Sequence, residues 1–127
     1  MSKDWHQDIK DYHNKVMQDR FFEYPHLPSQ AYQNLRRNLI KEEIKETLDA
    51  IRNDDLVELA DGIADSIVVL LGTAVTYGID IRPIWDIVHA SNMAKKGGKL
   101  RDDGKMMKPE GWQPPDIKSE IDRQVRR

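Results

Sequence analysis

The chain has 127 residues, a size that fits a single domain with one hydrophobic core. Hydrophobic residues make up 39% of the chain and charged residues 33%, so we expect a core that is small or shared with another subunit. The absence of cysteine excludes disulfides, thiolate nucleophiles and cysteine-bound zinc. No run of about 18 apolar residues and no apolar leader is present, which predicts a cytoplasmic protein without a membrane span.

Apolar side chains recurring at steps of three and four predict that most of the chain is helical. Ser29, Asp54 and Asp80 are suitable N-caps, and Pro25 and Gly78 end the segments that precede them. The predicted helices span residues 3–20, 29–52, 55–77, 80–96 and 116–125. Part of the third helix is apolar nearly all round, and it contains small residues that permit close packing against a neighbour. A homo-oligomer is therefore expected.

The segment after the fourth helix has a different composition. Gly97-Gly98 ends that helix, and Asp103-Gly104 predicts a short β-hairpin. The following residues, 108–115, are predicted to be extended. We expect one domain over residues 1–127, with a core at 29–96 and a basic appendix at 97–127.

Charge is unevenly distributed along the chain, although the net charge is only −2. Residues 1–94 carry 10 basic and 16 acidic side chains, whereas residues 95–127 carry 10 and 6. This asymmetry indicates a cation site beside an anion site. Because the basic excess is small and the middle of the chain is acidic, no binding to nucleic acid is expected.

The acids of the middle of the chain are grouped on two predicted helix faces. They are Glu42, Glu43 and Glu46 on the second helix and Glu58, Asp61 and Asp65 on the third. On a helical projection, Glu43 and Glu46 continue the apolar stripe, and the acids of the third helix share a sector about 60° wide. The turn between the helices is short, so we expect them to pack antiparallel with the two acidic groups at similar height.

Converging carboxylates without neighbouring bases repel one another unless they are protonated or bind a hard divalent cation. Ligand sets of acids alone suit Mg²⁺, or Mn²⁺ as a substitute. A solvated acidic face is the structural alternative, but such a face usually carries lysine one turn away, and the third helix does not. A di-iron site needs two helical Glu-x-x-His pairs; the one such spacing, Glu23 to His26, is broken by Pro25.

Basic and amide side chains near the end of the fourth helix are candidates for holding a phosphate. Asn92 and Lys95 lie one turn apart, where they either contact a phosphate or supply ordinary helix-terminal charge. Trp112 either stacks on a base or pins the extended tail. The loop also carries basic residues that either line the mouth of an anion site or are solvated: Lys99, Arg101, Lys105 and Lys108.

The acidic motifs resemble those of a known family. Glu42-Glu43-Ile44-Lys45-Glu46, followed after eleven residues by Glu58-Leu59-Ala60-Asp61, is similar to the EExxE…ExxD pattern of MazG-like, all-α nucleoside triphosphate pyrophosphohydrolases. Gly111-Trp112-Gln113-Pro114-Pro115 is similar to a phage and bacterial branch labelled phosphoribosyl-ATP pyrophosphohydrolase-like. The resemblance covers about residues 29–117 and implies a four-helix bundle, assembled as a homodimer or a dimer-of-dimers tetramer.

The resemblance also implies roles for individual residues. Glu43, Glu46, Glu58 and Asp61 would ligate Mg²⁺, and the catalytic carboxylates would be Glu42, Glu43 and Glu46. Asp65, Asn92 and Lys95 would contact the substrate. The implied reaction is hydrolysis of a (deoxy)nucleoside triphosphate to a monophosphate and pyrophosphate, with water attacking the α-phosphorus. Two alternatives stay open: a phosphoribosyl-ATP pyrophosphohydrolase, and a non-catalytic helical oligomer that binds metal.

Overall fold

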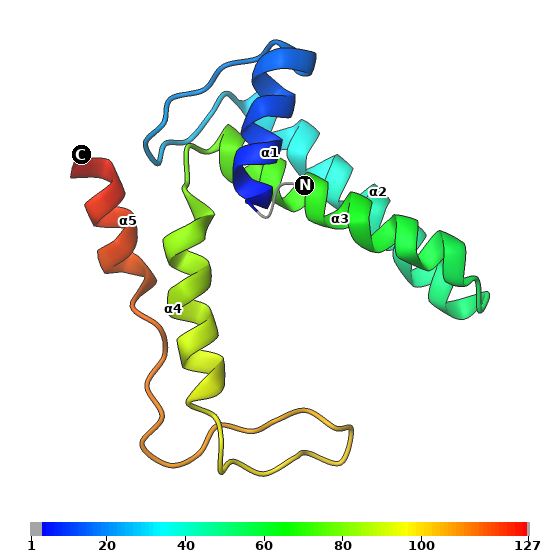
Figure 1. Cartoon of the computed structure of the whole chain (residues 1–127), viewed down its shortest axis with the longest axis vertical. Helices are drawn as coiled ribbons and strands as arrows, with labels where there is room; N and C mark the ends of the chain where they lie inside the picture. Colours follow the sequence, from blue (N-terminus) through cyan, green and yellow to red (C-terminus); the bar gives the residue numbers. More distant parts are fainter. Residues whose placement is uncertain (1–3, 127) are drawn as a thin grey trace. The chain divides into compact units, whose positions relative to one another are not determined.

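The structure is a computed structural model that describes residues 4–126 of the chain. Within this range it contains five α-helices, one π-helical turn and no strand (Figure 1). The predicted all-α fold is therefore confirmed. The chain divides into two compact units, with the boundary between Asp80 and Ile81, and each unit is described by itself.

The helices follow the predicted order. In the first unit α1 spans Trp5–Tyr12, α2 Gln30–Arg52 and α3 Leu56–Thr76, and in the second unit α4 spans Ile81–Met93 and α5 Ile117–Arg126. Ser29 caps α2 as predicted, whereas α3 is capped by Asp55, one residue later than expected. Asp116 caps α5, because its Oδ1 accepts a hydrogen bond from the Ser119 backbone N–H at 3.0 Å.

The first predicted helix is shorter than its hydrophobic pattern suggests. After α1 the backbone widens into a π-helical turn, His13–Met17, and Gln18 then adopts a left-handed conformation with φ of 57°. The Nδ1 atom of His13 bonds to Oδ1 of Asp19 at 3.0 Å, which ties the start of this turn to the second residue after its end. A left-handed residue cannot continue a helix, so the segment ends there.

The predicted β-hairpin in the second unit is wrong. Among the described residues the segment forms only one isolated antiparallel bridge, between Leu100 and Met106. Both side chains are exposed, so two strands here would have no apolar face to pack against, and an isolated two-stranded hairpin is marginal in water. The turn itself is present: Gly104 has a φ of 91°, and the Arg101 guanidinium pairs with Asp103 at 2.6 Å.

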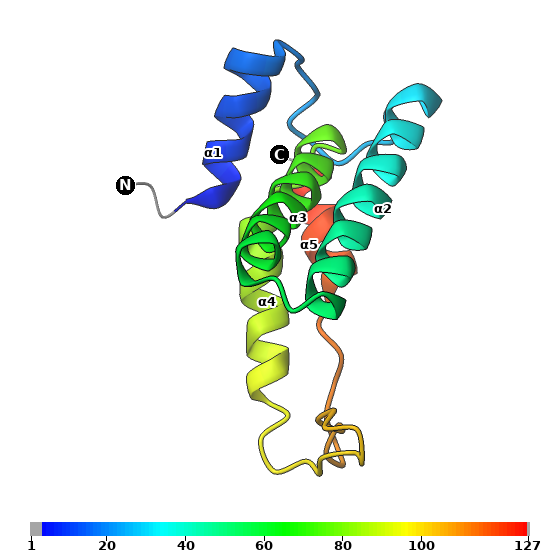
Figure 2. The same cartoon turned by 90° about the vertical axis from the view of Figure 1, so that its right-hand side faces the viewer.

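The antiparallel pair of α2 and α3 forms the long axis of the first unit, and both views show the two helices side by side (Figures 1 and 2). The two helices approach closely at Gly62, where an added Cβ would lie 2.7 Å from Oγ1 of Thr47. Beside it, the Oγ1 atom of Thr47 and the Oγ atom of Ser66 share a hydrogen bond of 3.1 Å. This contact fixes the axial register between the two helices.

A buried arginine holds the other end of the helix pair together. Arg36 of α2 donates from Nη2 to the Val69 carbonyl at 2.7 Å and from Nε to Oγ1 of Thr73 at 3.2 Å. Gly72 makes room for it, since an added Cβ would lie 2.5 Å from Arg36 Nη2 and 2.9 Å from Nε2 of His13. Burial lowers the pKa of Arg36, and the nearby carboxylate of Asp19 partly opposes this shift.

Large apolar side chains remain exposed along the pair of helices in the first unit. They include Leu35, Ile44, Leu48, Ile51, Leu56, Val57, Ile63, Val68 and Leu70. By length and composition α3 is also apolar enough to cross a membrane, and only 28% of its most apolar stretch is buried. The small residues of α3 do not contribute to this surface, because Gly62, Gly72 and Ala74 are buried within the protomer.

Candidate metal and phosphate site

The predicted acidic residues lie on the exposed edge of the α2–α3 pair. Glu43 and Asp65 are half-buried between the helices. The remaining acids are exposed: Glu42, Glu46, Glu58 and Asp61. A further acid of α2, Asp49, stands apart, because it pairs with Lys45 at 2.8 Å and with Arg52 at 2.7 Å, which lowers the pKa of its carboxyl.

The register set by Thr47 and Ser66 decides which acids meet. Because the helices run antiparallel, residues that precede Thr47 on α2 lie level with residues around and after Ser66 on α3. Asp65 therefore lies beside Glu43 and Glu46. At 1.5 Å per residue, Asp61 lies about 6 Å nearer the hairpin turn and Glu58 about 10 Å nearer. The two acidic groups are offset along the axis, rather than level as the short turn suggested.

Electrostatics identify Glu43 as the centre of the acidic group. The pKa of Glu43 is raised by burial first, and then by the charges of Glu46, Asp65 and Glu42. Its Oε2 atom is enclosed and has no hydrogen-bond partner. A carboxylate oxygen that is shielded from water and surrounded by other acids is a strongly unfavourable arrangement for the ionised form.

The donor set fits a hard divalent cation, which would pair the enclosed Oε2 atom and offset the repulsion between the acids. Within residues 4–126, however, no three His, Asp or Glu side chains are gathered closely enough to hold a metal ion as they stand. Mutual repulsion between the exposed carboxylates favours such a spread. Glu43, Glu46 and Asp65 are the nearest approach to a ligand set.

The predicted phosphate contacts lie in the second unit. Lys95 donates from Nζ to Oδ1 of Asn92 at 3.1 Å, just beyond the end of α4. Trp112 donates from Nε1 to the Ser91 carbonyl at 2.9 Å, so it pins the loop to α4, which is the structural one of its two predicted roles.

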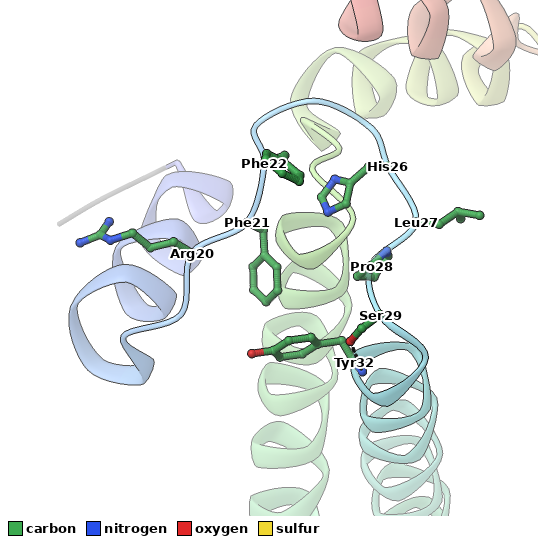
Figure 3. A pocket seen from close by; sticks show the side chains of 8 residues that line it. All are labelled: Arg20, Phe21, Phe22, His26, Leu27, Pro28, Ser29 and Tyr32. Carbon is green, nitrogen blue, oxygen red and sulfur yellow. Dashed lines mark hydrogen bonds between the residues drawn. The ribbon is translucent and has the colours of Figure 1, made fainter.

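An aromatic pocket of about 550 Å³ in the first unit was not predicted (Figure 3). The Phe21 ring meets Tyr32 edge to face with centroids 5.0 Å apart, and Phe22 meets His26 at 5.3 Å. The aromatic run from Phe21 to His26 was the available signal in the sequence. From Tyr32 to Glu43 the rise along α2 is about 16 Å, so the pocket and the acids lie at different heights on the first unit.

Comparison with known proteins adds the family. The family model for phosphoribosyl-ATP pyrophosphohydrolase matches residues 10–92, more than half of the chain, and this range includes the five acids of the two motifs and Asp65. A search of curated proteins finds no match. The chain therefore belongs to the phosphoribosyl-ATP pyrophosphohydrolase family, a MazG-like, all-α family of nucleoside triphosphate pyrophosphohydrolases.

Proposed function

We propose that the protein hydrolyses a (deoxy)nucleoside triphosphate to the nucleoside monophosphate and pyrophosphate in a Mg²⁺-dependent reaction. The observation that carries this proposal is the enclosed, unpartnered Oε2 atom of Glu43 among the acids of α2 and α3. Membership of the family supports the reaction class, and enzymes of this family are typically Mg²⁺-dependent.

The cation would be held by Glu43, Glu46 and Asp65. Asp61 lies next along the exposed edge of the α2–α3 pair, and Glu58 lies nearer the hairpin turn. A bound Mg²⁺ neutralises phosphate oxygens and lowers the pKa of coordinated water. The carboxylates of this chain orient the attacking water and accept its proton, and Glu42 is the exposed acid free to do so beside the ligands. The water oxygen bonds to the α-phosphorus, the bond between the α- and β-phosphates breaks, and pyrophosphate leaves.

We also propose that the exposed apolar surface of α2 and α3 is covered by a second copy of the chain, as a homodimer or a dimer of dimers. So many exposed large apolar side chains on two neighbouring helices are unusual on a monomer. The acids of α3 and the hydrogen bond between Thr47 of α2 and Ser66 of α3 favour a protein partner over a membrane, because charged side chains are costly in lipid. A cytoplasmic protein that does not bind nucleic acid remains our expectation.

Phosphoribosyl-ATP is the second candidate substrate, because the matching family model bears its name. It carries the same triphosphate and differs on the base side, so the acids would treat both substrates alike.

Product analysis tests the proposal. The protein is incubated with each common NTP, each dNTP and phosphoribosyl-ATP, once with Mg²⁺ and once with EDTA. Release of a monophosphate and pyrophosphate that EDTA abolishes supports the proposal and identifies the substrate. Asp65→Asn is expected to abolish turnover, while Asp49→Asn, a matched loss of charge on α2 outside the acidic group, keeps it. Release of a diphosphate and inorganic phosphate, or no turnover of any compound, contradicts the proposal.

A further inference from the structure

Two hydroxyl groups meet between α2 and α3, beside the acids. Thr47 is half-buried and Ser66 is 9% exposed, and the Oγ1 atom of one lies 3.1 Å from the Oγ atom of the other. The hydroxyl of Thr47 also donates to the Glu43 carbonyl at 2.8 Å. A hydroxyl has a single proton, so Ser66 is the donor in the bond between the two side chains. The hydrogen bonds therefore run in one direction, from Ser66 to Thr47 and from Thr47 to the backbone of Glu43.

Each end of this chain of hydrogen bonds lies at an acid. On α2 it ends at the carbonyl of Glu43, and on α3 it begins at Ser66, which directly follows Asp65. Glu43 and Asp65 are the two half-buried members of the acidic group. The pKa of Glu43 is raised by burial, then by the charge of Glu46 and then by that of Asp65. The carboxylates of Glu43 and Asp65 repel each other, whereas the two hydroxyls join the backbone segments that carry them.

Packing leaves the Thr47 side chain little freedom. A Cβ added at Gly62 would lie 2.7 Å from its Oγ1 atom and 3.2 Å from its Cα atom. Gly62 and Ser66 are one turn apart on α3, so Thr47 contacts the same face of that helix twice. Metal ligands whose supporting groups are already ordered lose less freedom on binding, which strengthens the binding.

We propose that Thr47 and Ser66 are positioning residues, which keep Glu43 and Asp65 close enough for a divalent cation to draw their carboxylates together. The hydroxyls act through the backbone and do not ligate the cation themselves. The proposal rests on the proposed function, because it concerns the metal site of that reaction. The acidic motifs assign no role to either hydroxyl.

The test is the affinity of the full-length protein for Mn²⁺ in the absence of nucleotide, measured by electron paramagnetic resonance of the free ion. Mn²⁺ is the probe because it takes the same oxygen ligands as Mg²⁺. Thr47→Val and Ser66→Ala are expected to weaken Mn²⁺ binding roughly tenfold or more, the usual effect of removing a group that orients a metal ligand. Both should raise the Mg²⁺ concentration needed for half-maximal hydrolysis. Thr47→Ser keeps the hydroxyl and should restore the affinity.

Thr76→Val is the matched control. Thr76 is 1% exposed and donates to the Gly72 carbonyl at 2.8 Å, so this variant removes the same kind of hydrogen bond within the same unit. It lies about 16 Å farther along α3 than Asp65. We expect it to lower the free energy of unfolding without changing the Mn²⁺ affinity. The comparison separates positioning of the acids from a general loss of stability.

Unchanged Mn²⁺ affinity in Thr47→Val and Ser66→Ala would overturn the proposal, and so would equal weakening by Thr76→Val or a failure of Thr47→Ser to restore binding. If Thr47→Val does not fold, Ser66→Ala, the smaller change, decides. Absence of Mn²⁺ binding in the unchanged protein also overturns the proposal, whether or not nucleotides are hydrolysed.

The proposed function fails separately. If Mn²⁺ binds with the expected dependence on the two hydroxyls but no nucleotide is hydrolysed, the positioning role stands without the activity. If nucleotides are hydrolysed and neither Thr47→Val nor Ser66→Ala changes the Mn²⁺ affinity or the Mg²⁺ dependence, the activity stands and the positioning role is refuted.

Discussion

Replacing Glu43 by glutamine should stabilise the protein when no metal is present. The enclosed Oε2 atom has no hydrogen-bond partner, and Glu46, Asp65 and Glu42 repel the ionised carboxylate. An unsatisfied buried polar atom costs about 1–3 kcal/mol, and glutamine removes the charge and adds an amide donor for the acids beside it. We therefore expect a gain of about 1 kcal/mol in the free energy of unfolding in EDTA, a rise of roughly 4 °C in Tm for a domain of this size.

The pH dependence has a definite sign. The pKa of Glu43 is raised in the folded state, so the folded protein holds this proton more tightly than the unfolded chain does. The stability that this proton confers is present below the ordinary glutamate pKa and is lost as the pH rises through the raised value. The advantage of Glu43→Gln over the unchanged protein should therefore be small in acid and grow towards neutral pH.

Thermal unfolding in EDTA and in Mg²⁺, followed by circular dichroism, measures both effects. In the unchanged protein, Mg²⁺ at about one hundred times its Kd should add about 2.7 kcal/mol, and Glu43→Gln should lose most of that gain. Glu42→Gln is the control, since it removes an equal charge from an exposed neighbour. The reasoning is refuted if Glu43→Gln is no more stable than the unchanged protein in EDTA, or if Mg²⁺ stabilises both proteins equally.

Three further predictions follow from the packing of the first unit. Asp65→Asn should reduce the rate of pyrophosphate release more than Glu58→Gln does, because Glu58 lies two turns nearer the hairpin turn; the reverse ranking in a steady-state assay would contradict the register. Gly72→Ala should cost about 1–3 kcal/mol in urea unfolding because the added methyl group displaces Arg36, and an unchanged midpoint would contradict that contact. If the proposed homo-oligomer forms through the exposed apolar side chains of α2 and α3, Leu70→Glu should convert it to a monomer in light scattering; an oligomer that persists would contradict this interface.

The helices could be predicted from the sequence because their signals are local. Ser29 and Asp116 occupy the cap positions that their side chains favour, and Gly78, with a φ of 70°, ends the segment after α3. The β-hairpin prediction failed because an Asp-Gly pair specifies a turn, whereas strands also need a face to bury. Leu100 and Met106 have no such face in the structure.

The membership of the acidic group could be predicted, but its internal geometry could not. The spacing along each helix predicts that its acids share one face. The axial register between α2 and α3, however, depends on which small residues pack against each other. Here Gly62 and Thr47 set that register, and it makes Asp65 the neighbour of Glu43.

The buried cluster around Arg36 was missed for a similar reason. An arginine near an apolar stripe is usually solvated, and the partners of Arg36 are a backbone carbonyl and a threonine hydroxyl on another helix. The signal was on α3, where Gly72, Thr73 and Thr76 interrupt an otherwise apolar run.

The hydrogen bond between Thr47 and Ser66 also determines where the chain can change in length. It joins the last third of α2 to the middle of α3, so the acids do not depend on the turn alone to set their spacing. The turn itself is exposed and held by local backbone bonds, from Asp54 N–H to the Ile51 carbonyl at 3.2 Å and from Asp55 N–H to the Ala50 carbonyl at 3.1 Å. Extra residues inserted there would extend the far end of the hairpin and leave the acids in place. The turn is therefore a position where a new loop could be added without altering the chemistry of the site.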